Sequence, residues 1–244
     1  MANQSVWYFT GLPTDIIKNI ESDLHTHYGN QMKDSRLIGH EINKVKRDSK
    51  NTWIPTDHWV AGWLWHFIQK ANRTNFLYDL NHIDAENMQY TQYEEGMFYG
   101  WHNDAGIATA YKPQVTIDAL HTQSNEDYLR ERTVIQHELI RKLSFTLQLS
   151  GPDDYEGGNV QFLDENNKSY IAPRQQGTLI VFDSRTQHRV CKVTKGTRKS
   201  IVGWVVGPRW KWKWLKLKLF KVSGRILALL GHAISFLKKM DFLL

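Results

Sequence analysis

Hydrophobic side chains beyond Asn75 recur at every second position in short runs, and this period constrains the fold more than any other feature of the chain. Alternate side chains of a β-strand point to opposite faces of a sheet, whereas a helix repeats its faces about every 3.6 residues. Clusters of Gly, Pro, Asn and Asp separate the runs, as in all-β domains. The pattern predicts a β-sandwich or jelly roll with strands within residues 76–80, 88–93, 97–101, 114–120, 143–149, 159–163, 178–182, 188–193 and 200–206.

The first 75 residues show a different pattern, with two stretches of helical period after one short aromatic run. Residues 6–9 are predicted to form a strand, and a helix with Thr14 as its N-cap follows. A second helix is predicted over residues 57–71, with an apolar stripe that we expect to pack in the core. The stripe consists of Trp59, Trp63, Leu64 and Phe67. We therefore expect a mainly β protein with supporting helices, an α+β fold in which residues 1–75 form a helical support layer and residues 76–208 form the β core.

The charge of the chain is divided between a slightly acidic main part and a basic tail. Of the 31 Lys and Arg residues, nine follow Pro208, whereas only one of the 25 Asp and Glu residues does. The first 208 residues therefore carry 22 basic and 24 acidic groups, and the net charge of +6 arises in the tail. We expect a single domain over residues 1–208 and a basic, Trp- and Leu-rich extension over residues 209–244.

The single cysteine and the apolar runs bear on the cellular location. Cys191 has no second cysteine with which to form an intramolecular disulfide, which is typical of a reducing compartment. The first five residues lack the basic and apolar regions of a signal peptide. The longest mostly apolar run, residues 226–237, is shorter than the roughly 20 residues that a membrane span requires. We expect a cytoplasmic protein, with peripheral membrane association through the tail as an alternative.

Two His-x-Asp triplets are candidates for a metal site. On a strand, positions i and i+2 point to the same side, so both His82 with Asp84 and His102 with Asp104 could supply two converging ligands. Spacing alone does not choose between them, although Asp84 leads into a turn-like stretch and His102 ends an aromatic run. His188 is the best candidate for a third ligand, because the β pattern places it on an inward position.

Five blocks of sequence carry a family resemblance, and they are residues 93–104, 141–149, 155–162, 177–182 and 188–204. In this order they resemble the Fe(II)- and 2-oxoglutarate-dependent dioxygenases, and among them the prolyl-4-hydroxylase-like branch with the PKHD-type hydroxylases and their phage relatives. The resemblance implies a double-stranded β-helix, a cupin-like jelly roll, in which His102, Asp104 and His188 form the catalytic metal triad. Three protein ligands on one side would leave Fe(II) open to the 2-oxo acid and to O2.

The same resemblance implies residues that bind 2-oxoglutarate. Arg198, ten residues after His188, lies near the family position whose cation binds the far carboxylate of this co-substrate, and a guanidinium suits that task. Tyr93 resembles a family tyrosine that helps to hold the carboxylate, and Trp204 is expected to close the pocket. Ser144, Thr146 and Gln148 share one strand face by period two, and any of them could contribute a further hydrogen bond. The resemblance leaves open whether ascorbate is a further cofactor.

The activity implied is hydroxylation of an unactivated C–H bond, most simply in a peptidyl proline, with release of succinate and CO2. Oxygenases of the same superfamily that act on nucleic acids or small metabolites are the alternative, because a fold does not specify its substrate. A non-catalytic β-sandwich that retains metal ligands is an alternative of another class. The polar loop over residues 122–132 lies where family members place a substrate lid, and we expect specificity there.

The tail allows three interpretations. Residues 209–221 alternate apolar and cationic side chains, and residues 226–244 follow a loose helical stripe. Such a segment could lie at a membrane surface, contact nucleic acid through Trp and Lys, or pack on the domain or on a second subunit. Nucleic acid is the weaker partner, because the main part of the chain has no basic excess. The sequence does not specify the oligomeric state.

Overall fold

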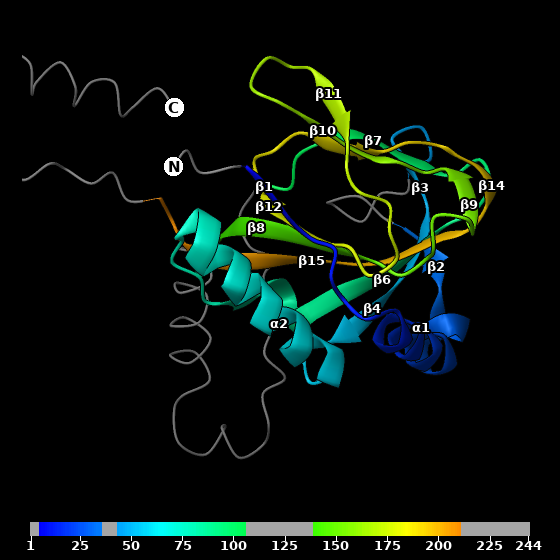
Figure 1. Ribbon diagram of the computed structural model, residues 1–244, viewed down its shortest axis with the longest axis horizontal. Helices are drawn as coiled ribbons and strands as arrows, with labels where there is room; N and C mark the ends of the chain where they lie inside the picture. Colours follow the sequence, from blue (N-terminus) through cyan, green and yellow to red (C-terminus); the bar gives the residue numbers. More distant parts are fainter. Residues whose placement is uncertain (1–4, 36–42, 106–138, 211–244) are drawn as a thin grey trace, which may run out of the picture. The chain divides into compact units, whose positions relative to one another are not determined.

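The computed structural model describes residues 5–35, 43–105 and 139–210 (Figure 1). The helices are α1 (Thr14–Tyr28) and α2 (Trp59–Ala71), with short helical turns at Gly29–Gln31, Asn72–Phe76 and Asp84–Glu86. The strands are β1 (Val6–Phe9), β2 (Lys33–Asp34), β3 (Arg47–Asp48), β4 (Lys50–Pro55), β5 (His82–Ile83), β6 (Asn87–Tyr93), β7 (Phe98–His102), β8 (Leu139–Gln148), β9 (Tyr155–Gly157), β10 (Val160–Leu163), β11 (Ser169–Ile171), β12 (Leu179–Asp183), β13 (His188–Val190), β14 (Val193–Gly196) and β15 (Arg198–Pro208).

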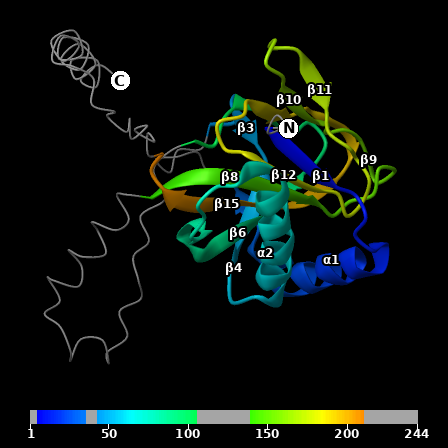
Figure 2. The same ribbon diagram turned by 60° about the vertical axis from the view of Figure 1, so that its left-hand side comes forward.

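Two antiparallel sheets form the double-stranded β-helix that was expected. The larger sheet has the order β1-β12-β8-β15-β6-β4-β2, and β5 pairs with β15. The smaller sheet has the order β11-β10-β13-β7-β3, and β9 pairs with β14 beside it. Figures 1 and 2 show α1 and α2 on one side of the larger sheet and the smaller sheet on the other. The fold class predicted from the period of two is confirmed.

Alternate residues of the central strands belong to two separate cores. In β12, Leu179 and Val181 pack in the core beneath the helices, whereas Ile180 and Phe182 pack between the two sheets. On the helix side, α1 and α2 contribute fully buried side chains to the core. These are Ile17, Ile20, Leu24, Leu64 and Ile68. The strands are therefore buried on both faces, and the face that is turned from the helices is available to line a site between the sheets.

Most of the predicted strands are present, and the exceptions have physical reasons. Seven of the nine predicted runs overlap observed strands. The run over residues 76–80 is not a strand, because the helical turn after α2 ends at Phe76 and Leu77 adopts a left-handed φ of 58°. The run over residues 114–120, the loop over residues 122–132 and the tail beyond Trp210 lie outside the described residues.

The N-terminal layer contains the strand predicted over residues 6–9 and further strands that were not predicted. Strand β1 pairs with β12, and β4 pairs with β6 over six residues, so both extend the larger sheet. β4 was not predicted, because its neighbours in sequence are polar and β6, the strand with which it pairs over its full length, is more than 30 residues away. Local period alone does not reveal such pairing.

The starts of the two helices differ slightly from the prediction, since α1 begins one residue earlier and α2 two residues later. Thr14 is the first residue of α1, and Pro13 is its N-cap, without a side-chain hydrogen bond. α2 begins at Trp59 because the ring of His58 accepts a hydrogen bond from the backbone N–H of Val60. This position leaves Trp59 52% exposed, with its indole N–H donating to Asp23, so Trp59 does not belong to the core as expected. No helix within the described ranges is long and apolar enough to cross a membrane.

Two glycines provide a matched test of the backbone. Gly196 has a φ of 74°, and an added Cβ would collide with the carbonyl oxygen of Asp154, whereas Gly62 in α2 has free space around it. We expect Gly196→Ala to lower the free energy of unfolding by about 1–3 kcal/mol. Gly62→Ala should raise this free energy by about 0.5–1 kcal/mol, because alanine is the better helix former. Urea unfolding of both variants measures these effects, and equal effects at the two positions would contradict the backbone assignment.

Candidate active site

Pairing between β7 and β13 brings two histidines of distant sequence position together. His102 at the end of β7 is the register partner of His188 at the start of β13, and the ring centroids lie 4.1 Å apart. Asp104 follows β7, and its backbone N–H donates to the carbonyl of Ser184 at 2.8 Å. This contact fixes the segment after β7 beside the turn between β12 and β13. The three predicted ligands therefore meet between the two sheets.

The three side chains present donor atoms to a common point. Nε2 of His102 and Nε2 of His188 lie 3.8 and 3.5 Å from the carboxylate oxygens of Asp104, and one donor atom from each residue lies within 4.8 Å of the others. Nδ1 of His102 contacts the carbonyl of Gly100 at 2.8 Å, and Nδ1 of His188 contacts that of Thr186 at 3.0 Å. Because a carbonyl only accepts, each Nδ1 carries the proton and each Nε2 keeps its lone pair for a ligand.

The protonation states suit a metal site as well. Burial and, after it, the neighbouring imidazole of His188 lower the pKa of His102 to about 4. Burial alone would raise the pKa of Asp104, but the two imidazoles and the polar hydrogens of Ser144 and Trp204 hold this pKa below its ordinary value. At neutral pH the site therefore offers a neutral His102 and a carboxylate, the forms that bind metals.

Two nitrogens and one carboxylate match a catalytic metal site better than a structural zinc site. Among the described residues, these three form the one group of His, Cys, Asp and Glu that could hold a metal. A structural zinc site is normally closed by four protein ligands, often including thiolates. Two His and one carboxylate on one side suit Fe(II), whose remaining positions stay open for small ligands.

The structure places the alternative triplet elsewhere. The side chain of His82 is exposed on β5, whereas Asp84 is 2% exposed and accepts a hydrogen bond from Nε of Arg141 at 2.7 Å. Asp84 is thus part of a buried ion pair. The choice that the sequence left open falls on His102 and Asp104, as the pair that has a third candidate ligand beside it.

A buried cation lies in the pocket that contains the three candidate ligands. Arg198, Val202 and Trp204 occupy one face of β15 and line this pocket. Arg198 is 2% exposed, and its Nη1 donates to the hydroxyl of Ser200 at 3.4 Å. Its Nε has no hydrogen-bond partner, and none of its atoms forms an ion pair within the described part of the chain. A buried guanidinium in this state favours an anionic ligand.

The other residues predicted to bind the co-substrate divide into two groups. Tyr93, Thr146 and Trp204 line the pocket, and the guanidinium carbon of Arg198 lies 5.6 Å from the ring centroid of Tyr93. The hydroxyl of Thr146 is buried without a hydrogen-bond partner among the described residues.

Ser144 and Gln148 are engaged elsewhere. The hydroxyl of Ser144 contacts that of Ser184 at 3.0 Å and lies on the side of Asp104. The amide of Gln148 donates to the hydroxyl of Tyr155 at 3.1 Å, outside the pocket lining. Of the three residues that the sequence left open, Thr146 therefore has the free polar atom that faces the pocket.

Two further residues of the pocket were not assigned from the sequence. The ring of Tyr99 stacks on His102 with centroids 3.6 Å apart. Burial raises the pKa of Tyr99 to about 12, so its hydroxyl stays protonated. Arg47, on the short strand β3, also lines the pocket. No sequence signal marked Arg47, because a two-residue strand in a polar stretch has no readable period.

Comparison with known proteins agrees with this geometry. Residues 88–206 match the family model of the 2OG-Fe(II) oxygenase superfamily. A PKHD-type hydroxylase from Parvibaculum lavamentivorans is 32% identical over 115 residues, which are 47% of this chain and 39% of the relative. Residues 88–206 of the chain therefore belong to the 2OG-Fe(II) oxygenase superfamily. The chain spans about two fifths of the length of this relative.

Solved structures share the fold of this chain. A prolyl-4-hydroxylase from Pseudomonas putida aligns with a TM-score of 0.59 and 17% identity, covering 84% of this chain and 93% of that one. A prolyl hydroxylase from Trichoplax adhaerens, in complex with a peptide fragment of hypoxia inducible factor, aligns with a TM-score of 0.58 and 15% identity, covering 82% and 83%. At these identities the likeness establishes the double-stranded β-helix.

Replacement of one histidine in each triplet tests the assignment of the metal ligands. We expect His102→Ala to lower the affinity for Fe(II) by about 10-fold or more, because one of three protein ligands is lost. His82→Ala is the matched control, since His82 is exposed, and its affinity should equal that of the wild type. Equilibrium dialysis with Fe(II) under anaerobic conditions measures both. Unchanged binding in His102→Ala would contradict the assignment.

Proposed function

We propose that the protein is an Fe(II)- and 2-oxoglutarate-dependent dioxygenase that hydroxylates an unactivated C–H bond, most simply in a prolyl residue of a peptide, and releases succinate and CO2. The observation that carries the proposal is the buried, unpaired guanidinium of Arg198 in the pocket of His102, Asp104 and His188. A dicarboxylic 2-oxo acid fits this arrangement, since one end would bind the metal and the other the cation.

The charge of Arg198 supports a dicarboxylate over a neutral ligand. A buried charge without a partner costs several kcal/mol unless a ligand compensates it. A carboxylate can accept two parallel hydrogen bonds from the fork of a guanidinium, which is a strong and directional interaction. The unpaired Nε of Arg198 and the unpaired hydroxyl of Thr146 in the same pocket offer two donors for such a group.

Each residue of the site has a separate role in this proposal. His102 and His188 would hold Fe(II) through Nε2, and Asp104 would bind it as an ionised carboxylate. A bound Fe(II) would supply the activation of O2 and the oxidation of the C–H bond. Ser144 and Trp204 keep the carboxylate of Asp104 ionised, and the buried apolar side chains of Val190 and Phe182 line the pocket and limit access of water.

The substrate class rests on the relatives rather than on the pocket. The relatives named above are hydroxylases, two of them prolyl hydroxylases, and one of these is complexed with a peptide. We extend this to a peptide or protein substrate for the present chain. A cytoplasmic location, a role for ascorbate and a membrane-surface or protein contact of residues 209–244 remain part of the proposal.

Formation of succinate tests the proposed reaction directly. Purified protein incubated with Fe(II), O2 and 2-oxoglutarate should release succinate slowly without a prime substrate and faster with a proline-containing peptide. Omission of Fe(II) or the change His102→Ala should remove this activity. If neither succinate formation nor anaerobic binding of 2-oxoglutarate is found, a non-catalytic binding module becomes the better explanation.

Arg198 should control the requirement for 2-oxoglutarate. We expect Arg198→Gln to raise KM for 2-oxoglutarate by about 10-fold or more, because a charge-assisted pair with the far carboxylate is lost. Lys199→Gln is a matched control, since Lys199 forms an ion pair with Glu21 at 2.8 Å and does not line the pocket. Succinate formation at varied 2-oxoglutarate measures KM for all three proteins. An unchanged KM in Arg198→Gln would show that another group binds the carboxylate.

A further inference from the structure

We propose that Arg47 binds a carboxylate of the prime substrate, so that the substrate is an acidic peptide with Asp or Glu close to the hydroxylated residue. This inference rests on the proposed function and specifies its substrate. It concerns a second buried cation in the pocket, separate from Arg198, that neither the motifs nor the metal chemistry assigns.

Arg47 belongs to the wall of the pocket beside the candidate ligands. It lies on β3, where its register partner is Tyr99 on β7, and it is 7% exposed. The carbon atom of its guanidinium lies 4.8 Å from the ring centroid of Tyr99, and the same ring stacks on His102. A group bound to Arg47 would therefore lie next to the reacting end of the pocket.

Neutral hydrogen-bond acceptors fix the orientation of this guanidinium. Nε of Arg47 donates to the hydroxyl of Ser49 at 2.9 Å, and Nη2 donates to the side-chain oxygen of Gln89 at 3.3 Å. The hydroxyl of Ser49 in turn donates to that of Ser35 at 2.8 Å. These bonds hold the side chain in place and leave its positive charge uncompensated.

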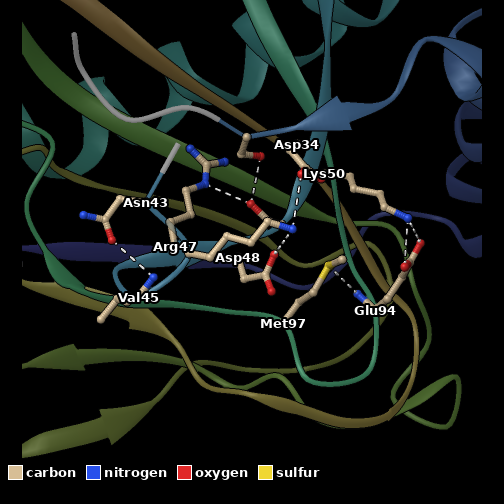
Figure 3. A network of polar contacts seen from close by, with 11 residues as sticks. Asp34, Asn43, Val45, Arg47, Asp48, Lys50, Glu94 and Met97 are labelled. Atoms are coloured by element: carbon tan, nitrogen blue, oxygen red, sulfur yellow. Dashed lines mark hydrogen bonds and ion pairs between the residues drawn. The ribbon is translucent and has the colours of Figure 1, made fainter. Parts of the chain in front are cut away.

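The lysines around Arg47 show the opposite arrangement. Lys44 pairs with Asp34 at 3.2 Å and with Asp48 at 3.6 Å, and Lys50 pairs with Glu94 at 2.8 Å (Figure 3). Arg47 is the more buried cation, yet it forms no ion pair within the described part of the chain. Even the carboxylate of its neighbour Asp48 is directed to Lys44. The acidic groups of this network therefore compensate the exposed lysines and leave the buried arginine available.

The charge balance of the proposed complex leaves Arg47 for the prime substrate. Fe(II) together with Asp104 would carry one net positive charge, and Arg198 would carry a second. These two charges match the two carboxylates of 2-oxoglutarate. The charge of Arg47 would remain buried without a partner, which is unfavourable unless the substrate brings one negative group.

A carboxylate of a peptide suits Arg47 better than the phosphates of a nucleic acid. One fixed guanidinium offers a single bidentate contact, whereas nucleic acids are bound by several cations along the backbone. The first 208 residues carry 24 acidic and 22 basic groups, so they provide no general attraction for a polyanion. A peptide with a single acidic side chain near the hydroxylated residue would match the single positive charge of Arg47.

Matched peptides test this assignment through equilibrium binding. Each peptide of the panel contains one proline and one Glu, and the position of the Glu before or after the proline differs from peptide to peptide. Each Glu peptide has a twin, which is the same peptide with Gln in place of Glu. Calorimetric titration into the protein loaded with Fe(II) and 2-oxoglutarate, without O2, measures both affinities. We expect one Glu peptide to bind at least about 10-fold more tightly than its Gln twin. In Arg47→Gln this ratio should fall to about one, in Arg47→Lys it should be retained in part, and in the control Lys44→Gln it should be unchanged.

Several outcomes would overturn the assignment. These are equal binding of all twins, a ratio that persists in Arg47→Gln, no binding by any peptide, or an Arg47-dependent preference for a single-stranded oligonucleotide. If Arg47→Gln raised KM for 2-oxoglutarate but left the ratio of the Glu and Gln peptide affinities unchanged, Arg47 would bind the co-substrate instead. Iron-dependent succinate formation by the wild type is independent of these results. Absence of succinate formation in the wild type would refute the proposed function. Succinate formation together with equal affinities for the Glu and Gln peptides would refute the role of Arg47 alone.

Discussion

The central strands of the larger sheet are buried on both faces, and the rest of the structure depends on this constraint. One face of β8, β12 and β15 packs under the helices with apolar side chains, as Leu147, Val181 and Ile201 do. The other face meets the smaller sheet, and there β12 contributes apolar side chains whereas β8 carries the polar side chains of Ser144, Thr146 and Gln148 at the same period of two. Buried polar groups require partners. Among the described residues, the hydroxyl of Thr146 and Nε of Arg198 are buried without a partner and belong to residues that line the pocket.

The site is organised before any ligand binds. Backbone carbonyls fix the tautomers of His102 and His188, and the surroundings keep Asp104 ionised. Arg198 and Arg47 are held by neutral side chains and have no acidic partner among the described residues. Fixed donors and charges need no reorganisation when the ligand arrives, which favours tight binding and catalysis. The pocket thus has two buried guanidinium groups in the same lining as the three candidate metal ligands.

The parts of the molecule that depend on local pattern could be predicted from the sequence. The period of two identified most strands and placed His188 inward, and the ordered motifs pointed to Arg198 through a family resemblance. Other parts depend on contacts between distant segments. Strand β4 exists because it pairs with β6, and Arg47 reaches the pocket only because the two-residue β3 pairs with β7. Trp59 looks like a core residue in sequence but is exposed, because α2 begins there.

The central claim is that one pocket holds a dianion between a metal and Arg198, and the affinity for two 2-oxo acids tests it most directly. Anaerobic calorimetry would compare 2-oxoglutarate with 2-oxobutyrate, which lacks the far carboxylate, in the Fe(II)-loaded protein. We predict that 2-oxoglutarate binds at least about 10-fold more tightly, because only its second carboxylate reaches the buried guanidinium. Equal affinities of the two acids would contradict this claim.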